Sequence, residues 1–131
     1  MSGASRIIAA GPVIVEQGKV LLVKHGDDPF WKFPGGKWEE TDFDLEGTAR
    51  REAREELGIE VILRQPLRTL VVRSRGGVAF LIHFAAERRG EVRPGQHIRE
   101  WGWFPTDDLP KDAAPNVAPL VADHLGSQNR T

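Results

Sequence analysis

Residues 51–59 of the chain read Arg-Glu-Ala-Arg-Glu-Glu-Leu-Gly-Ile, and residues 35–40 upstream of them read Gly-Gly-Lys-Trp-Glu-Glu. With about 3.6 residues per helical turn, Leu45, Ala49 and Ala53 fall along one stripe. Gly58 stands where helices commonly end in a left-handed residue. The pattern predicts a helix from about Leu45 to Leu57. Its last turns carry three glutamates at i,i+3 and i,i+4 spacing, namely Glu52, Glu55 and Glu56.

The crowding of these carboxylates on one side of a helix has two interpretations. Like charges at this spacing repel unless something positive lies among them, and a hard cation such as Mg²⁺ or Mn²⁺ prefers oxygen ligands. Alternatively, Arg51 pairs with Glu55 at i,i+4 spacing and the segment is a solvated charged face. The turn Phe33-Pro34-Gly35-Gly36 favours the metal site, because a glycine backbone can approach a ligand closely and offer a carbonyl oxygen.

These residues resemble the Nudix (MutT-like) hydrolase family, whose box reads G-x5-E-x7-R-E-U-x-E-E-x-G-U, with U an aliphatic residue. The stretch that begins at Arg51 fits the second half of the box, and Gly36 fits its opening glycine. Asp42 stands where the family usually has glutamate. Eight residues rather than seven separate Asp42 from Arg51, so one residue is inserted, most simply around Phe43 and Asp44.

The insertion precedes the predicted helix, so the three glutamates keep their register. It leaves the role of Asp42 open. In the family this position supplies the acidic partner that orients the box arginine, here Arg51. Asp44 or Glu40 could substitute for Asp42 in that role.

The resemblance extends beyond the box and implies a fold. Residues 31–36 resemble the usual lead-in to the box, and residues 103–110 resemble the late strand and turn of the family. The implied fold is α/β, the Nudix α/β/α sandwich with a mixed β-sheet. We expect a single domain over residues 1–131, with a core from about 6 to 125. Strands are expected at Ile7–Val15, Lys19–Lys24, Val61–Arg64, Thr69–Arg73, Val78–Ala85 and Glu100–Phe104, and a second helix at about Asn116–Leu125.

The resemblance also implies metal-dependent hydrolysis of a pyrophosphate linkage in a nucleoside diphosphate linked to another group. Candidate substrates are nucleoside triphosphates, ADP-ribose and other nucleotide sugars, and dinucleoside polyphosphates. The implied ligands of Mg²⁺ or Mn²⁺ are the Gly35 carbonyl and the carboxylates of Glu52, Glu55 and Glu56, while Arg51 would orient a glutamate. The alternative is a catalytically weak nucleotide-binding or regulatory module, which the retention of all three glutamates disfavours.

The general base has more than one candidate. Family members use either a glutamate of the box or an acidic residue in the loop that leads to the late strand. Counted back from Trp103, the two usual loop positions carry His97 and Glu100. Glu52 is an equally good candidate, because His97 and Glu100 could instead be solvated surface residues.

Substrate contacts are expected around the glycine turn. Trp31 and Trp38 flank the turn, where an indole could stack on a nucleobase. Gly36 and Lys37 lie between them and could approach a phosphate. The alternatives are that Trp31 packs in the core, that Trp38 anchors its loop, and that Lys37 is a solvated surface charge.

Length and composition fit one small enzyme domain. The chain has 131 residues, of which 40% are hydrophobic, and no apolar run approaches the roughly 20 residues of a membrane span. It has no cysteine and no long apolar segment at its start, so we expect a cytoplasmic protein. A net charge of −1 disfavours nucleic acid as a partner and is easier to reconcile with a small phosphorylated molecule. The oligomeric state is left open, with a homodimer among the alternatives.

Overall fold

The computed structural model describes residues 5–74 and 76–128; the remaining residues of the expected domain 1–131 lie outside this description. The helix expected over Leu45–Leu57 is confirmed with the same bounds, and the second helix begins one residue after Asn116. In the described part of the chain, no helix is long and apolar enough to cross a membrane. The elements in chain order are β1 (Ser5–Glu16), β2 (Lys19–His25), β3 (Gly36–Lys37), α1 (Leu45–Leu57), β4 (Glu60–Pro66), β5 (Leu70–Ser74), β6 (Gly77–Arg89), β7 (Ile98–Pro105) and α2 (Val117–Gln128).

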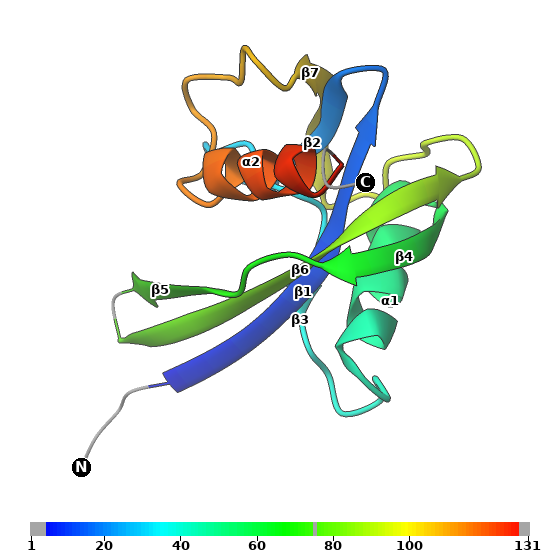
Figure 1. Cartoon of the computed structure of the whole chain (residues 1–131). Helices are drawn as coiled ribbons and strands as arrows, with labels where there is room; N and C mark the ends of the chain where they lie inside the picture. The colour runs from blue at the N-terminus through cyan, green and yellow to red at the C-terminus, as the bar shows by residue number, and fades with distance from the viewer. Residues whose placement is uncertain (1–4, 75, 129–131) are drawn as a thin grey trace.

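The strands form a mixed sheet in the order β4-β6-β1-β2-β7, with β3 paired to β1 and β5 paired to β6. The long central strands β1 and β6 run parallel, and the other pairs of strands are antiparallel. Figure 1 shows α1 and α2 on opposite sides of this sheet. The expected α/β/α sandwich with a mixed sheet is therefore confirmed.

Alternation of side chains along the central strands builds both halves of the core. Val13 of β1 packs in a cluster that includes Leu120 of α2, whereas Ile14, the next residue, packs in a cluster that includes Leu57 of α1. Residues 20–23 of β2 divide between the same two clusters. Successive side chains of a strand point to opposite faces, so a continuous apolar run can fill the layers above and below the sheet.

The glycine turn lies directly on β1, and two glycines make this possible. A Cβ atom on Gly11 would lie 2.0 Å from the Pro34 carbonyl oxygen and 2.9 Å from Gly35 Cα. Gly35 has a φ of +147°, and a Cβ atom there would lie 2.7 Å from the Ala10 carbonyl oxygen. The backbones of β1 and of the turn lie so close that a methyl group on either glycine would clash with the opposite backbone. This close packing fixes the turn relative to the sheet, beside α1.

Replacing Gly11 by alanine is expected to lower the free energy of unfolding by about 1–3 kcal/mol, because the added methyl group must push two backbones apart. Chemical denaturation measures this change. The control is Gly126→Ala in α2, where a Cβ atom meets nothing within 4 Å. Alanine favours a helix, so the control should be neutral or slightly more stable than the wild type. Equal stability of Gly11→Ala and Gly126→Ala would show that the turn can move away from β1.

Candidate active site

Local signals set the two ends of α1 and so the position of its glutamates. Asp44 has an extended backbone, and its Oδ1 accepts a hydrogen bond of 2.7 Å from the Gly47 N–H, which makes it the N-cap. Gly58 ends the helix with a φ of +65°, and its N–H donates to the carbonyl oxygens of Ala53 and Arg54. The inserted residue lies outside the helix, and the register of the glutamates is unchanged.

Asp42 is the acidic residue that contacts Arg51. The arginine Nε lies 2.8 Å from Asp42 Oδ1 and its Nη2 lies 2.9 Å from Oδ2, a two-pronged pair. The buried carboxylate of Asp42 also accepts from the Thr48 hydroxyl and the Glu39 N–H. The hydrogen bonds from Arg51 hold the pKa of Asp42 well below its usual range. Of the three acidic residues considered from the sequence, Asp42 therefore lies in position to orient Arg51, despite the insertion.

Arg51 also draws Glu55 to its own side of the helix. Arg51 Nη1 lies 3.1 Å from Glu55 Oε2, and Arg51 Nη2 donates to the Lys37 carbonyl oxygen at 2.9 Å. The Glu55 side chain is 55% exposed. The i,i+4 pair considered as the alternative to a metal site is thus present, and it involves Glu55.

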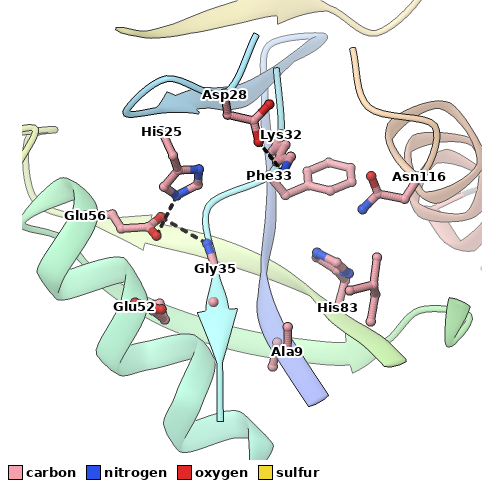
Figure 2. A pocket seen from close by; sticks show the side chains of 13 residues that line it. Ala9, His25, Asp28, Lys32, Phe33, Gly35, Glu52, Glu56, His83 and Asn116 are labelled. Carbon is pink, nitrogen blue, oxygen red and sulfur yellow. Dashed lines mark hydrogen bonds and ion pairs between the residues drawn. The ribbon is translucent and has the colours of Figure 1, made fainter. Parts of the chain in front are cut away.

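Glu56 is buried and links α1 to the glycine turn and to β2. Its Oε1 accepts from the Gly35 N–H at 3.0 Å, and its Oε2 lies 2.7 Å from His25 Nε2. The hydrogen bond with Glu56 raises the pKa of His25 against the opposing effect of burial. Figure 2 shows Glu56 reaching both partners from the helix.

Glu52 lies against the glycine turn, one turn of helix before Glu56. A Cβ atom on Gly36 would lie 1.7 Å from Glu52 Oε2, so a side chain at this position would displace the carboxylate. Burial and the negative charge of Glu56 raise the pKa of Glu52 to about 7, although Arg51 opposes the shift. The negative charges of Glu52 and Glu56 repel each other there, and a divalent cation bound between them would relieve this repulsion. The oxygen donors present fit Mg²⁺ or Mn²⁺.

A cavity of about 440 Å³ opens beside Glu52 and Glu56. Its wall also includes Gly35, Gly36 and His25, and in Figure 2 the other side of the cavity carries three further groups. These are the side chains of Phe33, His83 and Asn116. The cavity therefore has an acidic end and an end of mixed aromatic, imidazole and amide character.

The three box glutamates are not gathered at one point. Within residues 5–74 and 76–128, no three His, Asp or Glu side chains form a cluster that could hold a metal by themselves. Glu52 and Glu56 line the cavity, whereas Glu55 is turned to Arg51. A metal bound here would take its protein ligands from this carboxylate pair and from backbone oxygen of the turn.

The two loop candidates for a general base lie outside the lining of the cavity. His97 is exposed, and its carbonyl oxygen accepts from the Gly26 N–H. Glu100 pairs with Arg99 at 2.8 Å and lies 4.0 Å from Lys24 Nζ. Of the three candidates, the structure brings only Glu52 to the cavity.

Of the four residues expected to contact substrate, some line the main cavity and others lie away from it. Trp31 packs edge-on against Phe104, with ring centroids 4.6 Å apart, and the Lys24 ammonium lies 5.0 Å from its ring centre. Trp38 donates from Nε1 to the Asp42 carbonyl oxygen, which anchors its loop. Trp38 and Lys37 line a separate hollow, and only Gly36 of the four lines the main cavity.

Several cavity residues could not be assigned a role from sequence. Asp28 and Lys32 form an ion pair at i,i+4 spacing on a loop rather than a helix. His83 and Asn116 come from β6 and from the residue before α2, which are far apart in the chain. Alternation along the strand expected at Val78–Ala85 places His83 and Phe84 on opposite faces, but it does not say which face meets the cavity.

His83 is expected to make the protein less stable in mild acid. Burial lowers its pKa from 6.5 to about 4, and its Nδ1 has no hydrogen-bond partner among the residues that the structure describes. The unfolded chain therefore takes up this proton first, so stability falls as the pH drops from 6.5 towards 4, by up to about 3 kcal/mol. His25 has a raised pKa, which gains stability on acidification and partly offsets the loss.

Chemical denaturation at a series of pH values compares the wild type with His83→Gln, which cannot take up this proton. The variant should lose less stability than the wild type between pH 6.5 and 4. His97→Gln, at an exposed position, should follow the wild type. Identical pH dependence in wild type and His83→Gln would show that His83 is solvated in both states.

The chain matches the NUDIX domain over residues 5–124. A MutT-like protein of Streptomyces ambofaciens is 27% identical over 119 residues, which cover 91% of this chain and 76% of that protein. The crystal structure of a MutT NUDIX hydrolase from Burkholderia pseudomallei superposes with a TM-score of 0.82 at 26% identity, covering 91% of this chain and 98% of that one. An Ap4A hydrolase of C. elegans superposes with a TM-score of 0.80 at 22% identity, covering 93% and 97%. The domain match over most of the chain, together with the shared fold, shows that this chain belongs to the Nudix hydrolase family.

Proposed function

We propose that this chain, working as a single domain, hydrolyses a pyrophosphate linkage in a nucleoside diphosphate derivative with the help of Mg²⁺ or Mn²⁺. One observation carries the proposal. Two carboxylates one helical turn apart, Glu52 and Glu56, face a glycine turn at the end of a cavity of about 440 Å³. A volume in this range suits a small-molecule ligand, and phosphate oxygens require neutralisation of just the kind that a divalent cation provides.

Each residue of the acidic end has a distinct role in the proposal. Glu56 is held rigidly by the Gly35 N–H and by His25, so it presents charge in a fixed direction. Arg51, held by Asp42, ties the residue after the glycine turn to α1 through the Lys37 carbonyl oxygen. When bound, the divalent cation neutralises phosphate charge and makes an attacking water more acidic. Glu52 and Glu56 would hold it, with the Gly35 carbonyl.

Glu52 is our choice of general base. Its carboxylate lines the cavity, whereas His97 and Glu100 do not. A water molecule between Glu52 and a bound phosphate could therefore transfer its proton to the Glu52 carboxylate.

The substrate is proposed as a class. Nucleoside triphosphates, nucleotide sugars including ADP-ribose, and dinucleoside polyphosphates all contain the required linkage. The names of the similar proteins, which include a MutT hydrolase and an Ap4A hydrolase, support this class without choosing a member. The side of the cavity with Phe33, His83 and Asn116 is where we place the group attached to the pyrophosphate.

A substrate panel tests the proposal. Release of phosphate, pyrophosphate or nucleoside monophosphate is measured for each class with Mg²⁺, with Mn²⁺ and with excess chelator. We expect turnover of at least one class, its loss on chelation, and its recovery when the metal is added back. Ligand binding without turnover under every condition would favour the regulatory binding module instead.

A further inference from the structure

The residue at the insertion carries an exposed aromatic side chain that catalysis does not use. Phe43 lies between β3 and α1 and is 96% exposed. The backbone on both sides of Phe43 is held, because Asp44 caps the helix on one side and Trp38 donates to the Asp42 carbonyl oxygen on the other. In Figure 1 this loop runs past the end of α1, away from the core. Covering so exposed a phenyl group with an apolar surface is favourable.

A hollow of matching character lies beside this loop. It has a volume of about 290 Å³ and is lined by Ile8 and Trp38 together with Arg6, Ile7 and Lys37. Ile8 is 44% exposed and Trp38 is 42% exposed. None of these residues lines the catalytic cavity. The same chain therefore presents an apolar projection and an apolar recess.

Charge distinguishes the projection from the recess. Phe43 is followed in the chain by Asp44 and comes three residues after Glu40, and both acidic residues are exposed. Arg6 and Lys37, at the mouth of the hollow, are also exposed. The acidic loop of one molecule thus complements the basic rim of another, while two loops or two rims would repel each other. This complementarity selects a second copy of the chain as the occupant.

We propose that this chain forms a two-fold symmetric homodimer in which Phe43 of each copy enters the hollow between Ile8 and Trp38 of the other. The projection and the recess adjoin on one face, because the Trp38 indole that lines the recess is bonded to the loop that carries Phe43. With a two-fold axis at this face, each copy inserts its Phe43 into the recess of the other, so both contacts form at once, as in closed symmetric dimers. Phe43, beside the insertion in the box, then has a role in assembly, and the residues of the recess do not line the catalytic cavity.

Sedimentation of the full chain over roughly 1 µM to 1 mM tests the proposal, since this range covers weak and moderate dimer affinities. The wild type should approach twice its 14.6 kDa mass, and Phe43→Asp should raise the dimer dissociation constant at least about tenfold. Circular dichroism should be unchanged, because Phe43 contributes little to the fold of the monomer. Phe30→Asp, at a 46% exposed phenylalanine away from the hollow, is the matched control and should dimerise normally.

A second variant tests the choice of partner surface. Arg6→Glu reverses one charge at the rim and should also weaken the dimer, and added salt should weaken the wild-type dimer. A wild type that stays monomeric throughout the range overturns the proposal. A dimer that survives both Phe43→Asp and Arg6→Glu overturns it as well, because the contact must then lie on another face. Both outcomes are independent of whether the chain hydrolyses the proposed substrates.

Discussion

The Glu56→Gln variant is expected to lose roughly 10²–10³ in kcat, and Glu52→Gln a similar factor, because each removes a charge fixed at the reacting end of the cavity. Glutamine keeps the size of Glu56 and can still accept from the Gly35 N–H. Its NH₂ group, however, can neither accept the bond from His25 nor serve as an oxygen ligand. Glu52→Gln also removes the proposed base.

Glu55→Gln is the matched comparison on the same helical turn, and it should reduce kcat by only about tenfold, the range of a supporting contact. Its side chain is 55% exposed and is paired with Arg51 rather than directed into the cavity. Glu46→Gln, in the first turn of α1, controls for the loss of one carboxylate from the helix. Steady-state kinetics at several metal concentrations measure all four variants. A loss in Glu55→Gln as large as in Glu56→Gln would mean that Glu55 leaves Arg51 to bind the metal.

The bounds of α1 and the spacing of its glutamates were predictable, because both depend on local signals. Gly58 ends the helix with its own positive φ, and helical periodicity follows from the backbone alone. The direction of Glu55 was also within reach of sequence, since the i,i+4 pair with Arg51 was one of two interpretations. Sequence could not show that the glutamates of one helix separate, with Glu55 in the ion pair and Glu52 and Glu56 at the cavity.

The other side of the cavity was beyond local reasoning. His83 and Asn116 meet there only because β6 runs parallel to β1 and α2 covers that face of the sheet. The indoles illustrate the opposite limit. Trp31 and Trp38 flank the glycine turn in sequence, and the turn itself packs on β1. Trp31 instead contacts Phe104, and Trp38 is hydrogen-bonded to the loop that carries Phe43. Proximity in sequence therefore predicted the carboxylates beside the glycine turn, whereas the two indoles follow the alternatives of core packing for Trp31 and loop anchoring for Trp38.

The second large effect is on stability. Asp42→Asn is expected to lower the free energy of unfolding by about 3 kcal/mol, at the lower end of the range for breaking a buried ion pair. The Asp42 carboxylate accepts from Arg51, Thr48 and the Glu39 N–H, and an amide group replaces one of its acceptor oxygens by a donor. For a chain of this size the melting temperature should fall by roughly 10 °C.

The pH dependence separates this effect from a general loss of packing. Arg51 holds the pKa of Asp42 below its ordinary 3.8, so the stabilisation is fully present above that pH and is lost as the pH falls below it. The gap in stability between wild type and Asp42→Asn should therefore be constant above about pH 5 and narrow below pH 4. Glu40→Gln, at an exposed acidic residue before the helix cap, should change stability by less than about 0.5 kcal/mol, as exposed substitutions do. An equal loss in both variants would mean that Arg51 exchanges between two acidic partners, and the orientation of the box arginine would then depend on the whole loop rather than on Asp42.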